Sequence, residues 1–390
     1  MRFFWLIFLV FLCFSCSQEN NSRKLYYRHF KAEKGFLTKK FQEKVRNDPP
    51  QWMLQQIKED LFPFKKMNIS LNALNQTDAK IPKNEKAVLR YRIVNNQVYL
   101  SSNRQKEGFE PCDRFQNALL TLCRLTKVPN VDFIMNHEDG TDHPFYLVED
   151  QAPIFGWAKL KTTPFLILVP DYRSVSTLWF DDLHKLIQGK NFSGVNKQWA
   201  EKNQKAFWRG TYTEPVHRKQ ICQISKEFGD SVDAGLTGFF LPHDQHLITF
   251  VKPGASYEEH MEFKYLPVLD GIMCSYPGFQ WRLLSGCLTM KQESDQIQWF
   301  YRALKPFVHY VPIKNDLSDL VAQVDLARNN DPLCKQISKN AKEFVLGNLL
   351  FEDVYLYLYL ALSNYAKCLD ESVLKDLKKT PKNPDWVLVH

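Results

Sequence analysis

Short apolar segments alternate with helix-like segments along much of this chain, and this alternation limits the fold more than any other feature. Apolar runs typical of buried strands occupy residues 131–135, 165–169, 206–208, 265–269, 287–290 and 309–313. Phe115, Leu119 and Leu122, at helical spacing, precede the first of these runs. A helix that leads into a buried strand is typical of parallel sheets with helices on their faces. The sequence therefore predicts an α/β protein.

The length of 390 residues exceeds that of one compact core, so we expect two main domains. A mostly polar stretch at 196–204 is the best candidate for the boundary between them. We predict a helical extension over 22–84, a first domain over 85–200, a second over 201–345, and a helical segment over 346–390.

Local patterns predict several elements outside the apolar runs. Residues 88–101 alternate apolar and polar side chains around Asn95-Asn96, as hairpins do. Pro49 and Pro50 are placed to open a helix that continues to about residue 64. Asp316 is placed to cap a helix over 317–328, and residues 332–346 predict another. The Tyr-rich and Leu-rich segment 351–369 predicts a terminal helix whose tyrosines belong to the core.

The first 21 residues resemble a targeting segment. Arg2 is followed by an apolar run over 3–14, then by Ser15, Cys16 and a polar stretch. The run is short for a membrane span, so cleavage, lipidation at Cys16 and retention as an anchor all stay open. We expect an exported or membrane-associated protein, lumenal in a eukaryote and envelope-associated in a bacterium. The net charge of +8 is dispersed and accompanies no recognition motif, which predicts no nucleic-acid partner.

Acidic residues follow directly on the predicted strand 131–135. Ligands of open α/β sheets bind at the carboxyl ends of strands, where Asp139 is suited to take a proton from an attacking hydroxyl. The alternative is a turn in which Asp139 caps backbone amides, and the residues alone favour neither. His137, Glu138, Asp139, Asp142 and His143 match no recognised metal-ligand spacing, so we expect no metal or other cofactor.

Two arginines are candidates for binding phosphate. Arg209 follows an apolar run and precedes Gly210 and Thr211, a pattern that lets a guanidinium and backbone approach a phosphate. Arg282 follows Trp281 in a second apolar segment. An ordinary surface ion pair would give the same pattern, so this signal alone is weak.

Ordered motifs from residue 207 onward resemble glycosyltransferase family 90, which includes capsule-associated, protein O-glucosyltransferase-like and lipopolysaccharide-modifying members. These motifs are Phe207-Trp208-Arg209-Gly210, Phe263-Lys264-Tyr265-Leu266 with Asp270-Gly271, Leu283-Leu284-Ser285-Gly286-Cys287, and a long match over 299–320. The resemblance implies a GT-B-like fold of two facing Rossmann-like domains, with residues 85–200 on the acceptor side and residues 201–345 binding the nucleotide-sugar. It also implies metal-independent, inverting transfer from a UDP-sugar. It also implies that Asp139 is the general base and that the donor is bound by Arg209, Gly210, Thr211, Asp270, Gly271, Arg282 and Ser285.

The match departs from the eukaryotic pattern in one region. Residues 276–282 form a Tyr-Pro-Gly-x-x-Trp-Arg motif that resembles bacterial members, and Cys287 replaces a serine. It therefore stays open whether Arg282 supplies the phosphate contact of the family. The donor sugar (glucose or xylose) and the acceptor (a glycan, a lipopolysaccharide or a protein) also stay open. The alternative to an enzyme is a non-catalytic glycan- or nucleotide-binding module on the same fold.

Overall fold

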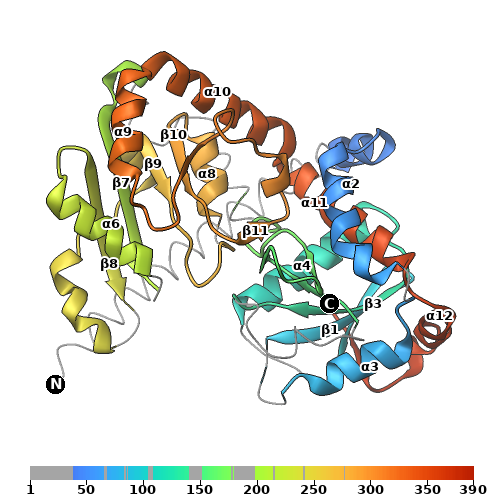
Figure 1. The fold of residues 1–390 in the computed structure, drawn as a ribbon. Coiled ribbons are helices and arrows are strands. Elements are labelled where there is room, and N and C mark those ends of the chain that lie inside the picture. Colours follow the sequence, from blue (N-terminus) through green and yellow to red (C-terminus); the bar gives the residue numbers. More distant parts are fainter. Residues whose placement is uncertain are drawn as a thin grey trace.

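The computed structural model describes residues 38–65, 68–82, 85, 87–103, 109–139, 152–176, 179, 198–213, 216–239, 242–275 and 277–390. Two sheets organise these residues, one in each half of the molecule (Figure 1). The strands of the first sheet come from residues 88–168 and from 386–388, and those of the second from residues 203–313. The α/β fold predicted from the sequence is confirmed, in the GT-B-like arrangement of two sheet-based halves.

The first sheet combines an antiparallel hairpin with parallel strands. Its order is β13-β2-β1-β3-β4-β6, and β3, β4 and β6 run parallel. Asn95 and Asn96 adopt φ values of 51° and 63° between β1 and β2, as a tight hairpin turn requires. The predicted hairpin is thus confirmed. The strands are β1 (Val88–Val94), β2 (Gln97–Ser101), β3 (Val131–Asn136), β4 (Ile154–Gly156), β6 (Leu166–Leu168) and β13 (Trp386–Leu388).

The second sheet is entirely parallel and has the order β12-β10-β9-β7-β8. Parallel strands need crossover connections, and helices supply several of them here. A small two-stranded sheet pairs β5 (Ala158–Leu160) with β11 (Gln296–Gln298) and so joins the two halves. The main strands are β7 (Asn203–Tyr212), β8 (Val232–Phe239), β9 (Phe263–Val268), β10 (Leu288–Gln292) and β12 (Val311–Ile313).

Helices cover both sheets, and the last long helix returns to the first half (Figure 1). Tyr355, Tyr357 and Tyr365 of that helix, α11, are at most 2% exposed, which confirms that its tyrosines belong to the core. The α-helices are α2 (Gln51–Leu61), α3 (Leu71–Lys80), α4 (Glu110–Leu125), α6 (Val216–Glu227), α7 (Tyr257–Met261), α8 (Gly278–Leu284), α9 (Leu320–Asn329), α10 (Asp331–Asn348), α11 (Phe351–Ala366) and α12 (Glu371–Leu377). Short 3-10 turns are η1 (Phe62–Phe64), η3 (Trp199–Glu201), η4 (Pro242–Phe250), η5 (Tyr301–Ala303) and η6 (Thr380–Lys382).

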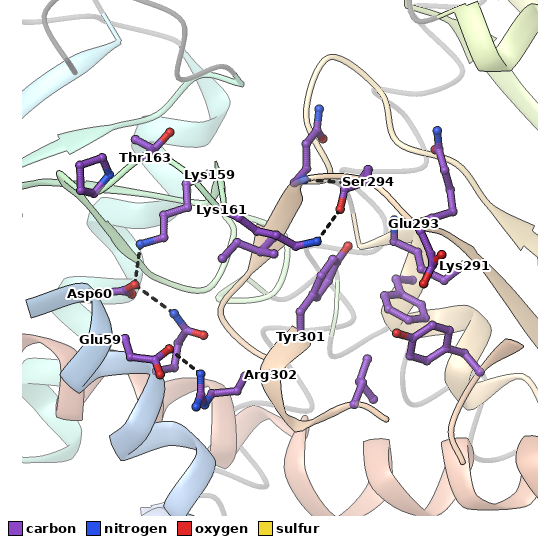
Figure 2. A pocket seen from close by; sticks show the side chains of 18 of the residues that line it. Glu59, Asp60, Lys159, Lys161, Thr163, Lys291, Glu293, Ser294, Tyr301 and Arg302 are labelled. Atoms are coloured by element: carbon purple, nitrogen blue, oxygen red, sulfur yellow. Dashed lines mark hydrogen bonds and ion pairs between the residues drawn. The ribbon is translucent and has the colours of Figure 1, made fainter. Parts of the chain in front are cut away.

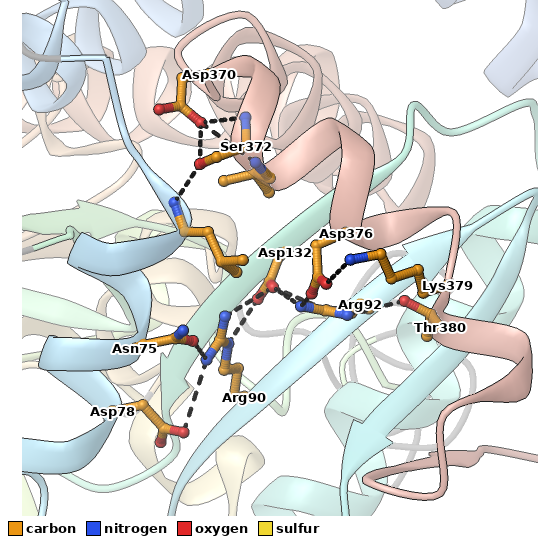
Figure 3. Close-up of polar contacts among 12 residues, drawn as sticks. Asn75, Asp78, Arg90, Arg92, Asp132, Asp370, Ser372, Asp376, Lys379 and Thr380 are labelled. Atoms are coloured by element: carbon orange, nitrogen blue, oxygen red, sulfur yellow. Dashed lines mark hydrogen bonds and ion pairs between the residues drawn. The ribbon is translucent and has the colours of Figure 1, made fainter.

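A buried ion cluster attaches the carboxy-terminal segment to the first sheet (Figure 3). Asp132 of β3 is fully buried and accepts hydrogen bonds from Arg90 and Arg92 of β1 at 2.7–2.8 Å. Arg92 also donates to Asp376 of α12, and its guanidinium lies 4.0 Å from the ring centre of Trp386. The cluster therefore holds α12 and β13 against the strand that leads to the candidate base.

Two local predictions were wrong. Asp316 does not cap the predicted helix, because α9 begins at Leu320, and Leu317 has a φ of 57° that no helix tolerates. Arg209 does not follow its strand, because β7 continues to Tyr212.

No single helix in the described part of the chain is long and apolar enough to cross a membrane, although the bent pair α10 and α11 passes that test together by length and composition. The predicted targeting segment lies outside the described residues.

Candidate functional site

Asp139 lies three residues beyond the end of β3, at the carboxyl edge of the first sheet. Its carboxylate accepts a hydrogen bond from Ser275, which belongs to the loop after β9 in the second half. Ser275 is buried, whereas solvent reaches Asp139. The candidate base is therefore placed where the two halves meet and where a substrate hydroxyl can approach it.

The environment of Asp139 suits it to accept a proton. Crowding by the surrounding protein raises the pKa of its carboxyl, while the Ser275 hydrogen bond and the nearby Arg218 guanidinium lower it, with a net rise. A carboxylate with a raised pKa holds an abstracted proton more firmly than a fully hydrated one. Burial raises the pKa of the Tyr172 hydroxyl, and Asp139 adds to this rise, which places Tyr172 near the same charge.

Arg218 is the central cation of the candidate site, and no sequence motif pointed to it. It lies in the first turn of α6, just after β7, and its Nε donates to the backbone carbonyl of Asp270 at 2.9 Å. Its Nη1 donates to the carbonyl of Thr211. Burial lowers the pKa of Arg218 to about 10, with Asp270 and Asp139 opposing the shift, so the guanidinium stays charged at neutral pH.

Gly271 keeps space open beside this guanidinium. A Cβ at position 271 would lie 3.0 Å from Nη2 of Arg218 and 3.4 Å from Oγ1 of Thr213. That hydroxyl is buried and has no hydrogen-bond partner among the residues that the structure describes. Because buried polar atoms are nearly always paired, this unpaired hydroxyl beside a cation indicates a place for a polar ligand.

The carboxylate of Asp270 does not face the candidate site; it holds in place the loop that contributes to the site. Lys291 holds one carboxylate oxygen at 2.9 Å, and Ser294 donates to the other. The carbonyl of Asp270 meanwhile contacts both Arg218 and His217, each at 2.9 Å. This buried carboxylate thus fixes the loop that orients Arg218.

Arg209 and Arg282 form a second cationic group around His260. Burial, followed by the charges of Arg282 and Arg209, lowers the pKa of His260 to about 3, against a backbone hydrogen bond at Ser256 that raises it. Arg209 pairs with Asp233 at 3.0 Å, and Arg282 lies 4.2 Å from the ring centre of Trp281. The predicted donor residues therefore divide between two places, and the group beside Asp139 contains neither of the predicted arginines.

The other predicted donor residues have local structural roles. Gly210 leaves room for the side chain of Trp208, because a Cβ at position 210 would lie 2.5 Å from that ring. Thr211 shares a 3.2 Å hydroxyl contact with Thr237 and offers its carbonyl to Arg218. Ser285 terminates α8 by donating to the carbonyl of Arg282 and accepting from the amide of Cys287.

No group of three or more His, Cys, Asp or Glu side chains is placed to hold a metal ion within the described ranges. His137 instead contacts Tyr91 at 3.0 Å inside an aromatic cage, while Asp142 and His143 lie outside the described residues. Independence from metal stays a prediction.

The chain is similar in sequence to proteins named as protein O-glucosyltransferases. Protein O-glucosyltransferase 2 of Danio rerio is 27% identical over 80% of this chain and 61% of its own length. Protein O-glucosyltransferase 1 of Rattus norvegicus is 24% identical over 82% of this chain and 81% of its own. This chain thus spans about three fifths of the first of these relatives. The crystal structure of TarM, with 14% identity, matches 42% of this chain and 36% of its own with a TM-score of 0.32, from which we conclude nothing.

The model of "Glycosyl transferase family 90" matches residues 47–381, which include both sheets' main strands, Asp139 and Arg218. The bacterial-type version of residues 276–282 stays a prediction, and Tyr276 lies outside the described residues. This chain belongs to glycosyl transferase family 90.

Proposed function

We propose that this protein transfers a sugar of the glucose or xylose type from a UDP-sugar to a hydroxyl of a glycan, lipopolysaccharide or protein acceptor, with inversion and without a metal ion. The observation that carries the proposal is the meeting of Asp139 and Arg218 across the two halves. Each influences the pKa of the other group, and Ser275 connects Asp139 to the loop after β9, whose Asp270 carbonyl holds Arg218.

Asp139 acts as the general base. It takes the proton from the acceptor hydroxyl while the hydroxyl oxygen forms a bond to the anomeric carbon of the donor sugar. The bond from that carbon to the diphosphate oxygen breaks, and its electron pair leaves with the diphosphate. Attack from the face opposite the leaving group inverts the anomeric configuration.

The guanidinium of Arg218 stabilises the negative charge that develops on the leaving diphosphate. Its Nη2 faces the space that Gly271 leaves open, and the unpaired Thr213 hydroxyl lies beside it. The amino terminus of α6 adds backbone amides and a partial positive charge, as strand–loop–helix phosphate sites do. Arg209 and Arg282 are proposed to act on the donor from the group around His260.

Donor turnover tests this proposal. The full chain is assayed for hydrolysis of UDP-glucose and UDP-xylose, with GDP-mannose and CMP-sialic acid as comparison donors, each with and without EDTA. We expect one UDP-sugar to be consumed selectively and EDTA to have no effect. A folded protein that binds none of these donors would favour the non-catalytic binding module instead.

Arg218 is tested against Arg209, its matched control in the same strand–helix unit. Removing one preorganised donor to a developing charge costs about 10²–10³ in kcat. Arg218→Met should therefore lose at least about 100-fold in kcat, while Arg209→Met should lose less because Asp233 already engages it. The reverse order of effects would assign the diphosphate to the group around His260.

A further inference from the structure

A cavity of about 570 Å³ lies between the two halves. The amino-terminal half contributes α2 and residues 159–164, and the other half contributes Phe279 and parts of 291–310. Figure 2 shows Asp60 and Lys159 on one side and Lys291 and Glu293 on the other, with Lys161 and Tyr301 between them. The volume of the cavity falls within the range of about 300–1,000 Å³ typical of small-molecule sites.

Aromatic side chains line part of this cavity. The ring of Phe279 lies edge-on to Tyr301 at 5.3 Å and to Tyr310 at 5.6 Å between ring centres. Both tyrosines are half-buried, and Phe62 contributes a ring that is 69% exposed. An aromatic surface of this kind packs against the apolar CH groups of a ligand.

The cations of the cavity are mostly neutralised by the protein itself. Lys159 pairs with Asp60 at 2.6 Å, Lys291 with Asp270 at 2.9 Å, and Arg302 with Glu59. Lys161 is exposed, and its nearest carboxylate is 3.9 Å away. The site therefore offers little uncompensated positive charge to an anion.

Hydrogen-bond acceptors, in contrast, are left without donors. The Oε1 of Gln296 is buried and unpaired among the residues that the structure describes, while its Nε2 donates to the carbonyl of Ile272 at 3.2 Å. The exposed carboxylate of Glu293 has no side-chain donor in the same part of the chain, and it lies close enough to help burial raise the pKa of Tyr310. An exposed carboxylate can accept a hydrogen bond from a ligand that donates, which hydroxyl groups do and ionised phosphates do not.

We propose that this cavity binds a short neutral oligosaccharide, which packs its CH faces on the aromatic wall and donates a hydroxyl hydrogen bond to Glu293. The inference rests on the proposed function in one respect, since it names a neutral glycan as the part of the acceptor that does not react. The Ile272 carbonyl that Gln296 holds belongs to the loop that carries Ser275. The cavity wall thus includes a residue that supports the loop beside Asp139.

The full chain is titrated with cellotriose, maltotriose, mannotriose and xylotriose, with binding followed by saturation-transfer NMR and calorimetry, and with UDP as the competitor. Phe62→Ala and Glu293→Ala remove one aromatic surface and one acceptor from the cavity. Leu326→Ala and Glu343→Ala are the matched controls, because both are exposed and neither lines the cavity. All four variants keep the residues around Asp139 and Arg218 intact.

We expect at least one trisaccharide to bind without competition from UDP. Glu293→Ala should weaken that binding about tenfold and Phe62→Ala about threefold, with both controls unchanged. The proposal is overturned if none of the four sugars binds, if the two cavity variants bind like the controls, or if UDP displaces the sugar. Sugar binding through Glu293 in a protein that hydrolyses no nucleotide-sugar would remove the proposed transfer while leaving this site.

Discussion

The buried cluster of Arg90, Arg92 and Asp132 gives a stability prediction whose size follows from its contacts. Asp132→Asn keeps the shape of the side chain but removes the only fully buried carboxylate among the cluster's described members. Both guanidinium groups then stay inside the protein without their main counter-charge. Breaking a buried ion pair by removing one partner costs about 3–5 kcal/mol.

The carboxylates that remain beside the two arginines decide where in the range of about 3–5 kcal/mol the loss of stability falls. Asp376 still contacts Arg92 at 2.7 Å, and Asp78 lies 3.8 Å from Arg90. Because each arginine keeps one partly exposed acid, we expect the lower end, about 3 kcal/mol in the free energy of unfolding. Asp376→Asn removes a partly exposed partner and should cost about 1 kcal/mol or less.

Urea denaturation followed by tryptophan fluorescence and circular dichroism measures both variants against the unmodified protein. We also expect the two sites to be coupled. The double variant Asp132→Asn/Arg90→Met should lose less free energy of unfolding than the sum of the two single variants, because Arg90→Met removes a charge that Asp132→Asn leaves unpaired. A loss below about 1 kcal/mol for Asp132→Asn, or strictly additive effects, would refute the reasoning.

Three further predictions concern the site and the pH dependence. Gly271→Ala places a Cβ 3.0 Å from Nη2 of Arg218, so it should raise KM for the donor several-fold in steady-state assays, and an unchanged KM would contradict the close approach. Ser275→Ala removes a hydrogen bond that lowers the pKa of the Asp139 carboxyl, so the acid limb of the kcat/KM profile should move to higher pH; a shift to lower pH would oppose the assignment. Burial raises the pKa of Asp353 from 3.8 to about 6, so its stabilising contribution is complete below pH 3.8 and is lost as the pH rises through 6, by about 3 kcal/mol. In urea melts from pH 4 to 7, Asp353→Asn should abolish this fall, and a slope equal to that of the unmodified protein would contradict it.

Elements whose signals are local were predictable from the sequence. The Asn95-Asn96 pair indicated the hairpin because few residues other than Gly accept positive φ at both turn positions. Strand β8 was not predicted, since its sequence Val-Asp-Ala-Gly-Leu-Thr-Gly-Phe has no continuous apolar run. Strand β13 was missed for a different reason, because only pairing with β2, far away in the chain, makes it a strand.

The same distinction applies to the candidate site. Asp139 was found because its place just beyond a strand is visible in the sequence, whereas its contact with Ser275 joins loops 136 residues apart. Arg218 lies between His217 and Lys219, where an arginine resembles any solvated helix residue. The carbonyl of Asp270 accepts the hydrogen bond that orients Arg218 in the site, and only folding brings these two residues together. Its position in the first turn after β7 was the one signal available beforehand.

The most direct test of the central claim is UDP-sugar turnover and UDP binding by Asp139→Asn, measured side by side with the unmodified protein. We expect UDP affinity and the unfolding transition to stay the same while turnover falls by about 10²–10⁴, the contribution of a general base. Turnover at a near-normal rate in a folded variant would contradict the assignment of Asp139 as the residue that takes the acceptor proton.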